Sequence, residues 1–190
     1  LGPISQFKGN LPKDSLYVFI PEDAYRVSGR SSFDQVKEDD EEVTSSFGVN
    51  PSTGVVLYYS LPAKPDTSSN LSLVISNQKG EVIRTYSNKK EKNFEAYPGG
   101  PSPDPLLLTK GGLNRFVWDM RAESINGIPK VYIEGSYVGR KVAPGNYFAK
   151  FTYDKETKTV PIHIIPDPRI SATDSDYQAQ ENILKSLEIN

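Results

Sequence analysis

The stretch that decides the fold is Asn146-Tyr147-Phe148-Ala149-Lys150-Phe151-Thr152-Tyr153, followed after a polar interval by Thr159-Val160-Pro161-Ile162-His163-Ile164-Ile165. Alternate residues of a β-strand point to the same face of a sheet. One face of the first run therefore carries Tyr147, Ala149, Phe151 and Tyr153, and one face of the second carries Val160, Ile162 and Ile164. The polar residues 154–158 predict a turn, so the stretch is predicted to form two strands of a half-buried sheet.

Similar short apolar runs occur on the N-terminal side of this stretch. Proline, glycine and asparagine bound most of them, and these residues end strands and form turns. We expect strands at residues 16–20, 55–61, 71–76, 81–86 and 113–120, and a short strand at 131–133. Short strands with turns between them, and no helices between the strands, are typical of an antiparallel sandwich.

The C-terminal end of the chain has a different pattern. Residues 171–174 contain serine, threonine and aspartate, which cap helix N-termini. Tyr177, Ile183, Leu184 and Leu187 then follow at helical spacing. The pattern predicts one C-terminal helix over residues 174–188.

The composition excludes several classes of protein. Because the chain has no cysteine, it can form no disulfide framework, thiolate metal site or cysteine nucleophile. The 22 basic and 24 acidic residues give a net charge of −2, whereas nucleic-acid-binding proteins carry a basic excess. No apolar run approaches the roughly 18 residues that a membrane helix needs. We therefore expect no nucleic-acid partner and no membrane span.

Few residues offer catalytic chemistry. His163 is the only histidine, and it lies on the face of its run opposite Ile162 and Ile164, where we interpret it as an exposed polar residue rather than a catalytic base. A metal site built from several histidines is excluded. Asp119 and Glu123 are close enough in sequence to be considered as the paired carboxylates of a glycosidase, but no feature of the sequence indicates that they share a cleft.

Two further features have a structural and a functional interpretation. The acidic run Glu38-Asp39-Asp40-Glu41-Glu42 offers oxygen ligands for Ca²⁺, but it lacks the spacing and the glycine of a calcium loop, and we favour a solvated loop. Trp118 could be a platform for a sugar ring, but its position between Phe116 and Met120 on one apolar face favours a core residue. We predict no catalytic residue, no cofactor and no metal ligand.

An ordered series of short motifs extends over most of the chain. Its parts are Phe19-Ile20-Pro21-Glu22-Asp23-Ala24-Tyr25-Arg26, Asn50-Pro51 with Gly54-Val55-Val56-Leu57-Tyr58-Tyr59-Ser60-Leu61, Gly80-Glu81-Val82-Ile83-Arg84, Gly112-Leu113-Asn114-Arg115-Phe116-Val117-Trp118-Asp119-Met120-Arg121, Ala143-Pro144-Gly145-Asn146-Tyr147 and Pro166-Asp167-Pro168-Arg169. The series resembles the C-terminal region of the BNR-repeat, sortilin-like proteins that are often labelled glycosyl hydrolases. Several of these motifs are also similar to the immunoglobulin-like domain of the flagellar hook-capping protein.

This resemblance implies an all-β fold: an antiparallel, immunoglobulin-like β-sandwich over residues 50–169, with an N-terminal extension over 1–49 and one C-terminal helix within 170–190. It also implies that the sandwich follows a β-propeller in an exported bacterial protein, periplasmic or extracellular. Because the chain begins with Leu1 and its only methionine is Met120, we expect that a signal peptide or a longer N-terminal region precedes it. The acidic insert at 34–46 and the proline-rich stretch before Leu113 depart from the family pattern.

The expected function is that of a non-catalytic accessory module, which docks on its upstream propeller or on another protein. Residues 16–26, which in the resembling family lead out of the propeller, hold Tyr17, Phe19, Tyr25 and Arg26, and aromatic residues and arginine are enriched at interface hot spots. An equally weighted interpretation is that this strand completes a sheet, with Tyr17 and Phe19 buried and Tyr25 and Arg26 in solvent. Tyr132 and Tyr137, in an irregular region, complete the predicted interface residues. The alternative is a carbohydrate-binding module that assists a glycosidase.

Overall fold

The computed structural model describes residues 2–6, 14–27, 52–62, 64, 68–91, 94–125, 131 and 136–188. Its helices and strands are α1 (Gly2–Ser5), β1 (Tyr17–Val18), β2 (Ala24–Arg26), β3 (Val55–Leu61), β4 (Leu71–Asn77), β5 (Val82–Ser87), β6 (Gly112–Trp118), β7 (Gly145–Tyr153), β8 (Glu156–Pro166) and α2 (Asp174–Glu188). The predicted strand at 131–133, with Tyr132, and the acidic run at 38–42 lie outside the described residues.

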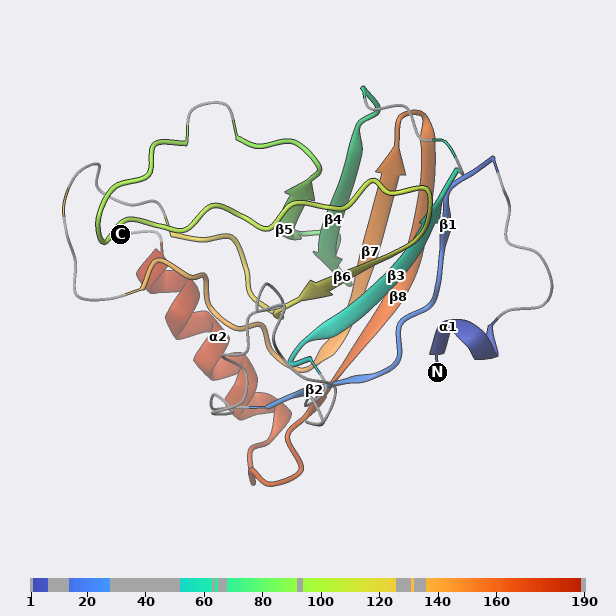
Figure 1. Ribbon diagram of the computed structural model, residues 1–190. Helices are drawn as coiled ribbons and strands as arrows, with labels where there is room; N and C mark the ends of the chain where they lie inside the picture. The colour runs from blue at the N-terminus through green and yellow to red at the C-terminus, as the bar shows by residue number, and fades with distance from the viewer. Residues whose placement is uncertain are drawn as a thin grey trace, which may run out of the picture.

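The strands form two sheets, with α2 outside them (Figure 1). One sheet has the strand order β1-β3-β6, and the other has the order β2-β8-β7-β4-β5. This arrangement confirms a mostly β fold with two sheets and one C-terminal helix. Among the described helices, none has both the length and the apolar character that a membrane span requires.

The hairpin of β7 and β8 is tighter than the sequence predicts. Tyr153 pairs with Glu156, so the turn consists of Asp154 and Lys155 rather than five residues. Asp154 has a φ of 50°, a left-handed conformation that aspartate tolerates better than most residues. The strands can therefore stay paired over nine residue pairs, from Gly145↔Ile164 to Tyr153↔Glu156.

The N-terminal segment corrects two expectations. Residues 16–20 were predicted to form one strand of an extension, but the chain forms β1 and then β2, and the two strands join different sheets. β2 pairs with β8 in parallel, with Ala24 opposite Ile164, so the sandwich is not purely antiparallel. Leu16 and Ala24 belong to the same hydrophobic core as the strands after residue 54. The segment therefore packs as part of the sandwich.

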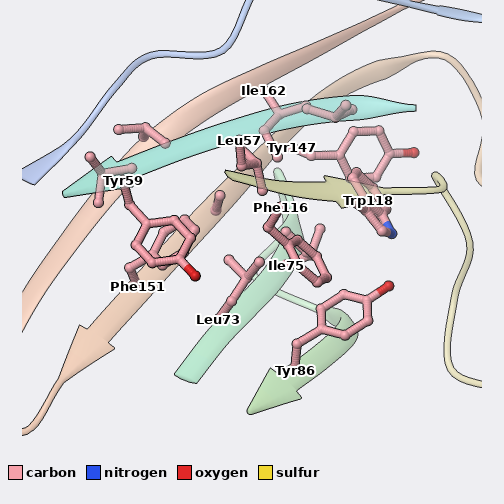
Figure 2. Close-up of a cluster of buried hydrophobic side chains, with 14 of the residues drawn as sticks. Leu57, Tyr59, Leu73, Ile75, Tyr86, Phe116, Trp118, Tyr147, Phe151 and Ile162 are labelled. Carbon is pink, nitrogen blue, oxygen red and sulfur yellow. The ribbon is translucent and has the colours of Figure 1, made fainter. Parts of the chain in front are cut away.

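The core lies between the two sheets and is rich in aromatic pairs (Figure 2). The ring centroids are 5.0 Å apart for Tyr59 and Phe151 and 5.7 Å apart for Trp118 and Tyr147. Trp118 is fully buried, and its indole N–H donates to the carbonyl of Arg121 at 2.9 Å. Its interpretation as a core residue is therefore confirmed, and a role as an exposed sugar platform is excluded. Five further residues from both sheets belong to the same core: Leu73, Phe116, Tyr147, Phe151 and Ile162.

Candidate interaction site

A groove opens at the edge of the three-stranded sheet, where β1 separates from β3. The two strands pair as Tyr17↔Ser60 and Val18↔Tyr59, and the Phe19 N–H donates to the Tyr58 carbonyl at 3.0 Å. If this register continued, Pro21 would lie opposite Val56. Proline has no N–H and cannot donate to the neighbouring strand. The pairing of β1 with β3 therefore ends before Pro21, and the chain crosses to the other sheet (Figure 1).

Gln6, the residue that follows α1, binds the segment that leaves β3. The Gln6 carboxamide accepts a hydrogen bond from the Ile20 N–H at 2.9 Å and donates one to the Ile20 carbonyl at 2.7 Å. Within α1, Gly2 lies so close to Glu22 that a Cβ added there would be 2.9 Å from a carboxylate oxygen. The sequence offered no signal for this contact, because Gln6 and Ile20 are 14 residues apart.

The groove between this segment and β3 has a volume of about 400 Å³. Ile20 and Tyr25 lie on its walls and are 54% and 53% exposed. Val56 and Tyr58 line it from β3. The rest of the lining comes from Gly2, Pro3, Pro21, Glu22, Asp23, Ala24, Val27, Ser52, Thr53 and Gly54. The groove therefore has somewhat more apolar than polar surface, and the acidic pair Glu22 and Asp23 is part of its lining.

Gly54 positions the end of the groove where β3 begins. Its φ of 141° lies in a region that residues with a side chain rarely adopt. A Cβ at this position would lie 2.4 Å from the carbonyl oxygen of Trp118, the last residue of β6. The close approach of the two strands at this point consequently requires glycine.

The structure separates the residues that were predicted to form an interface. Tyr25 is exposed at the groove, and Tyr17 is half-buried with its ring 4.9 Å from that of Phe19. Phe19 and Arg26 are buried, with 2% and 7% of their surface exposed, so in this structure they present no side chain to a partner. Tyr137 is buried as well. Of the predicted residues that the structure describes, Tyr25 is the one that is well exposed.

Arg26 is buried because it joins the sandwich to α2. Its Nε donates to the Val142 carbonyl at 2.7 Å, and its Nη2 donates to the Gln180 side chain at 2.9 Å. The guanidinium also lies 5.0 Å from the centre of the Tyr177 ring, within the range of a cation–π contact. Arg26 was expected at an interface with another protein, but it instead joins the sandwich to α2 of the same chain.

Among the described residues, no hydrogen bond or ion pair joins the candidate catalytic side chains His163, Asp119 and Glu123 to one another. His163 is exposed on β8, with its Nδ1 3.2 Å from an oxygen of Asp23. Asp119 accepts a hydrogen bond from the Arg121 N–H at 3.1 Å, and Glu123 accepts one from the Thr85 N–H at 2.7 Å. These carboxylates support the backbone of nearby segments. Within the part of the chain that the structure describes, no group of three histidine or acidic residues could hold a metal ion.

A second groove lies along β5, at the opposite edge of the five-stranded sheet from β2. It has a volume of about 590 Å³ and is lined by Tyr86, Phe94, Pro103, Pro105 and Leu106, among others. The backbone edge of β5 is already paired, because the Leu107 N–H donates to the Ser87 carbonyl at 3.0 Å and the Glu123 N–H donates to the Ile83 carbonyl at 3.0 Å. Leu107, in the proline-rich stretch before Leu113, and Glu123 thus cover this edge strand, whereas no described residue forms a hydrogen bond with the edge of β3 beside Pro21.

No family model, curated protein or solved structure matches this chain. The likeness to the C-terminal region of sortilin-like proteins therefore remains a prediction from the sequence motifs. What the fold and the site define is a β-sandwich with a groove at one sheet edge.

Proposed function

We propose that the chain is a non-catalytic interaction module of a larger, exported β-propeller protein, periplasmic or extracellular in bacteria, and that it docks on the propeller through the groove between Pro21 and Val56. The observation that carries this proposal is the exposure of Ile20 and Tyr25 on the walls of a groove of about 400 Å³. Exposed apolar groups gathered at one site are typical of protein-binding surfaces. Tyrosine is also among the residues that contribute most to binding.

The strand order supports an immunoglobulin-like topology as part of this proposal. In that architecture, strands A, B and E share one sheet, and strands C, F and G share the other. β1, β3 and β6 would correspond to A, B and E, and β4, β7 and β8 would correspond to C, F and G. β5 would then be an additional strand next to C. This order supports the resemblance on which the expectation of a β-propeller neighbour rests.

The alternative of a carbohydrate-binding module needs several exposed aromatic rings on one platform. Tyr25 and Phe148 are 53% and 37% exposed. Tyr25 lies beside Ile165 and Phe148 beside Pro161, so the two rings are offset by four residues of β8. That offset corresponds to about 13 Å along the strand. These two rings are therefore too far apart to stack on one sugar. Because the other aromatic ring that lines the groove, Tyr58, is half-buried, we favour a protein partner.

The proposal is tested by binding to the separately expressed region that precedes this chain in its parent protein. Tyr25→Ala and Ile20→Ala should each weaken the affinity by about 5- to 30-fold, because each removes an anchor of roughly 1–2 kcal/mol. Val82→Ala is the matched control, since Val82 is 60% exposed but lies on β5 at the far edge of the sheet. Unchanged affinity in both groove variants, measured by titration calorimetry, would place docking elsewhere.

A further inference from the structure

We infer that the edge of β3 at Val56 takes up an extended peptide segment with a basic side chain, which adds to the three-stranded sheet where β1 leaves it. This inference rests on the proposed docking role of the groove, and it names the kind of partner segment that fits there. The segment forms backbone hydrogen bonds with β3 and places side chains against Ile20, Tyr25 and Tyr58, which line the groove. This mode of recognition is β-strand addition.

The backbone groups of Val56 are directed toward the groove. The Tyr58 carbonyl accepts its hydrogen bond from Phe19 on the β1 side. Because residues two apart in a strand direct their N–H and C=O groups to the same side, Val56 also directs its backbone groups away from β6. Among the residues that the structure describes, none forms a hydrogen bond with Val56 on that side. Within the described part of the chain, Val56 therefore has one backbone donor and one backbone acceptor without a partner.

The chain keeps this edge from closing in two ways. Pro21, which the register would bring opposite Val56, has no N–H to offer to the Val56 carbonyl. The pairing of β2 with β8 also draws the residues after Pro21 to the other sheet, away from β3. Open strand edges favour pairing with another chain, and proteins usually cover them, as this one covers β5. An edge kept open inside this groove is suited to binding a strand.

The negative charge of the groove favours a partner segment with a basic side chain. Glu22 and Asp23 both line it and are both exposed, and no described lysine or arginine is among its lining residues. A lysine or arginine on the incoming segment would be attracted to this pair, whereas an acidic side chain would be repelled. The preferred occupant is therefore an extended segment of alternating apolar residues with one basic residue.

The test uses the full chain and two capped six-residue peptides of alternating valine and threonine, one with a central lysine and the other with glutamate in its place. Amide exchange is followed by NMR. In the free protein the Val56 amide should exchange quickly, while those of Val55 and Leu57, which face β6, are protected. The lysine peptide should protect Val56, and the glutamate peptide should bind about fivefold more weakly. A Val56 amide protected in the free protein, or unaffected by lysine peptide at about 1 mM, would overturn the inference.

A second measurement separates strand addition from contact through side chains alone. Two versions of the lysine peptide carry N-methyl groups on alternate amides, so that one version blocks the donors that face β3 and the other blocks those that face solvent. We expect the affinities of these two versions to differ by tenfold or more, because only one set of amides bonds to the edge. Equal affinities would show that no strand is added.

The outcome is distinguishable from that of the docking experiment. If Tyr25→Ala weakens binding to the upstream region but that region leaves the Val56 amide unprotected, the groove docks a partner without adding a strand. In that case the proposed function stands and this inference is wrong. If the lysine peptide protects Val56 but the upstream region does not bind, the strand site is real and its partner is a different protein.

Discussion

The inter-sheet core and the attachment of α2 depend on opposite kinds of interaction. The core contains fully buried apolar and aromatic side chains, among them Trp118, Tyr59 and Phe151. α2 buries one residue, Tyr177, and its other recorded contacts with the sandwich are polar. They join Arg140 to Glu181 and Glu188, Lys185 to Glu81, and Arg26 to Gln180.

This difference indicates that the sandwich and the helix respond to different perturbations. Burial of apolar surface stabilises the folded state by roughly 25 cal/mol per Å² and is not screened by salt. The sheets should therefore unfold only when the packing of the core is disturbed. Exposed ion pairs such as Lys185–Glu81 are weak and are screened by salt, whereas the largely buried pair of Arg140 and Glu181 is screened less. The helix should therefore detach under conditions that leave the sheets intact.

Removing the central ring should destabilise the whole domain. Trp118→Ala leaves a cavity between the sheets and removes the hydrogen bond to the Arg121 carbonyl, so the free energy of unfolding should fall by about 3–5 kcal/mol. Leu113→Ala on the same strand is the control, because Leu113 is 53% exposed and its loss should cost less than about 0.5 kcal/mol. Urea denaturation of both variants gives the comparison. A loss below about 1 kcal/mol for Trp118→Ala would mean that the core is not shared between the sheets.

Removing the cation beneath α2 should loosen the helix and spare the sheets. The Arg140 side chain is 10% exposed and contacts Glu181 at 3.7 Å as well as Glu188. Arg140→Ala leaves Glu188 without its partner and leaves Glu181 with Lys185 alone, and the cost should be about 1–3 kcal/mol. Hydrogen exchange should accelerate in α2 but not in β7 or β8.

Lys150→Ala is the control for Arg140→Ala. It removes the same charge from an exposed position on β7. We expect it to leave the exchange of α2 unchanged. If Arg140→Ala instead speeds exchange throughout both sheets, the helix and the core unfold as one cooperative unit. In that case α2 does not detach separately from the sandwich.

Acid should weaken the start of α2. Asp176 accepts hydrogen bonds from the Thr173 N–H and hydroxyl at 2.8 and 2.7 Å, and these bonds hold its pKa below the ordinary value of 3.8. A carboxyl group with a lowered pKa in the folded state contributes stability above its unfolded pKa. That contribution is lost as the pH falls from about 3.8 through the lower folded value.

This effect can be measured as pH-dependent amide exchange in the first turn of α2. Asp176→Asn should remove the pH dependence and weaken the cap at neutral pH. Asp174→Asn is the control, because Asp174 lies in the same turn but has no recorded hydrogen bond to the cap. If both variants change the exchange equally, the charge of the first turn rather than the cap is responsible.

The strands that the sequence predicts best are those with a regular alternation of apolar residues. Tyr147, Ala149, Phe151 and Tyr153 are all buried, as their spacing requires. The helix at Asp174–Glu188 also begins and ends where its cap and its spacing predict. Both patterns depend on the local periodicity of side chains, which follows directly from strand and helix geometry.

The short N-terminal strands and the groove could not be predicted from the sequence. β1 and β2 have two and three residues, too few for a period to be recognised. The exposed position of Tyr25 and the burial of Arg26 depend on pairing with β8 and on contact with α2. The partners of these two residues lie between 115 and 154 residues away in the chain, so local patterns carry no information about them.

The sequence by itself determined the two-sheet character, the core residues of the long strands, the C-terminal helix and the absence of cysteine chemistry. These follow from composition and from periodicity over a few neighbouring residues. The tertiary structure alone decided which short strand joins which sheet, the parallel pairing of β2 with β8, and the open edge at Val56. Such features depend on contacts between residues far apart in the chain. Pro21, for example, ends the pairing of β1 with β3 only because the register would place it opposite Val56, and this register cannot be derived from the local sequence.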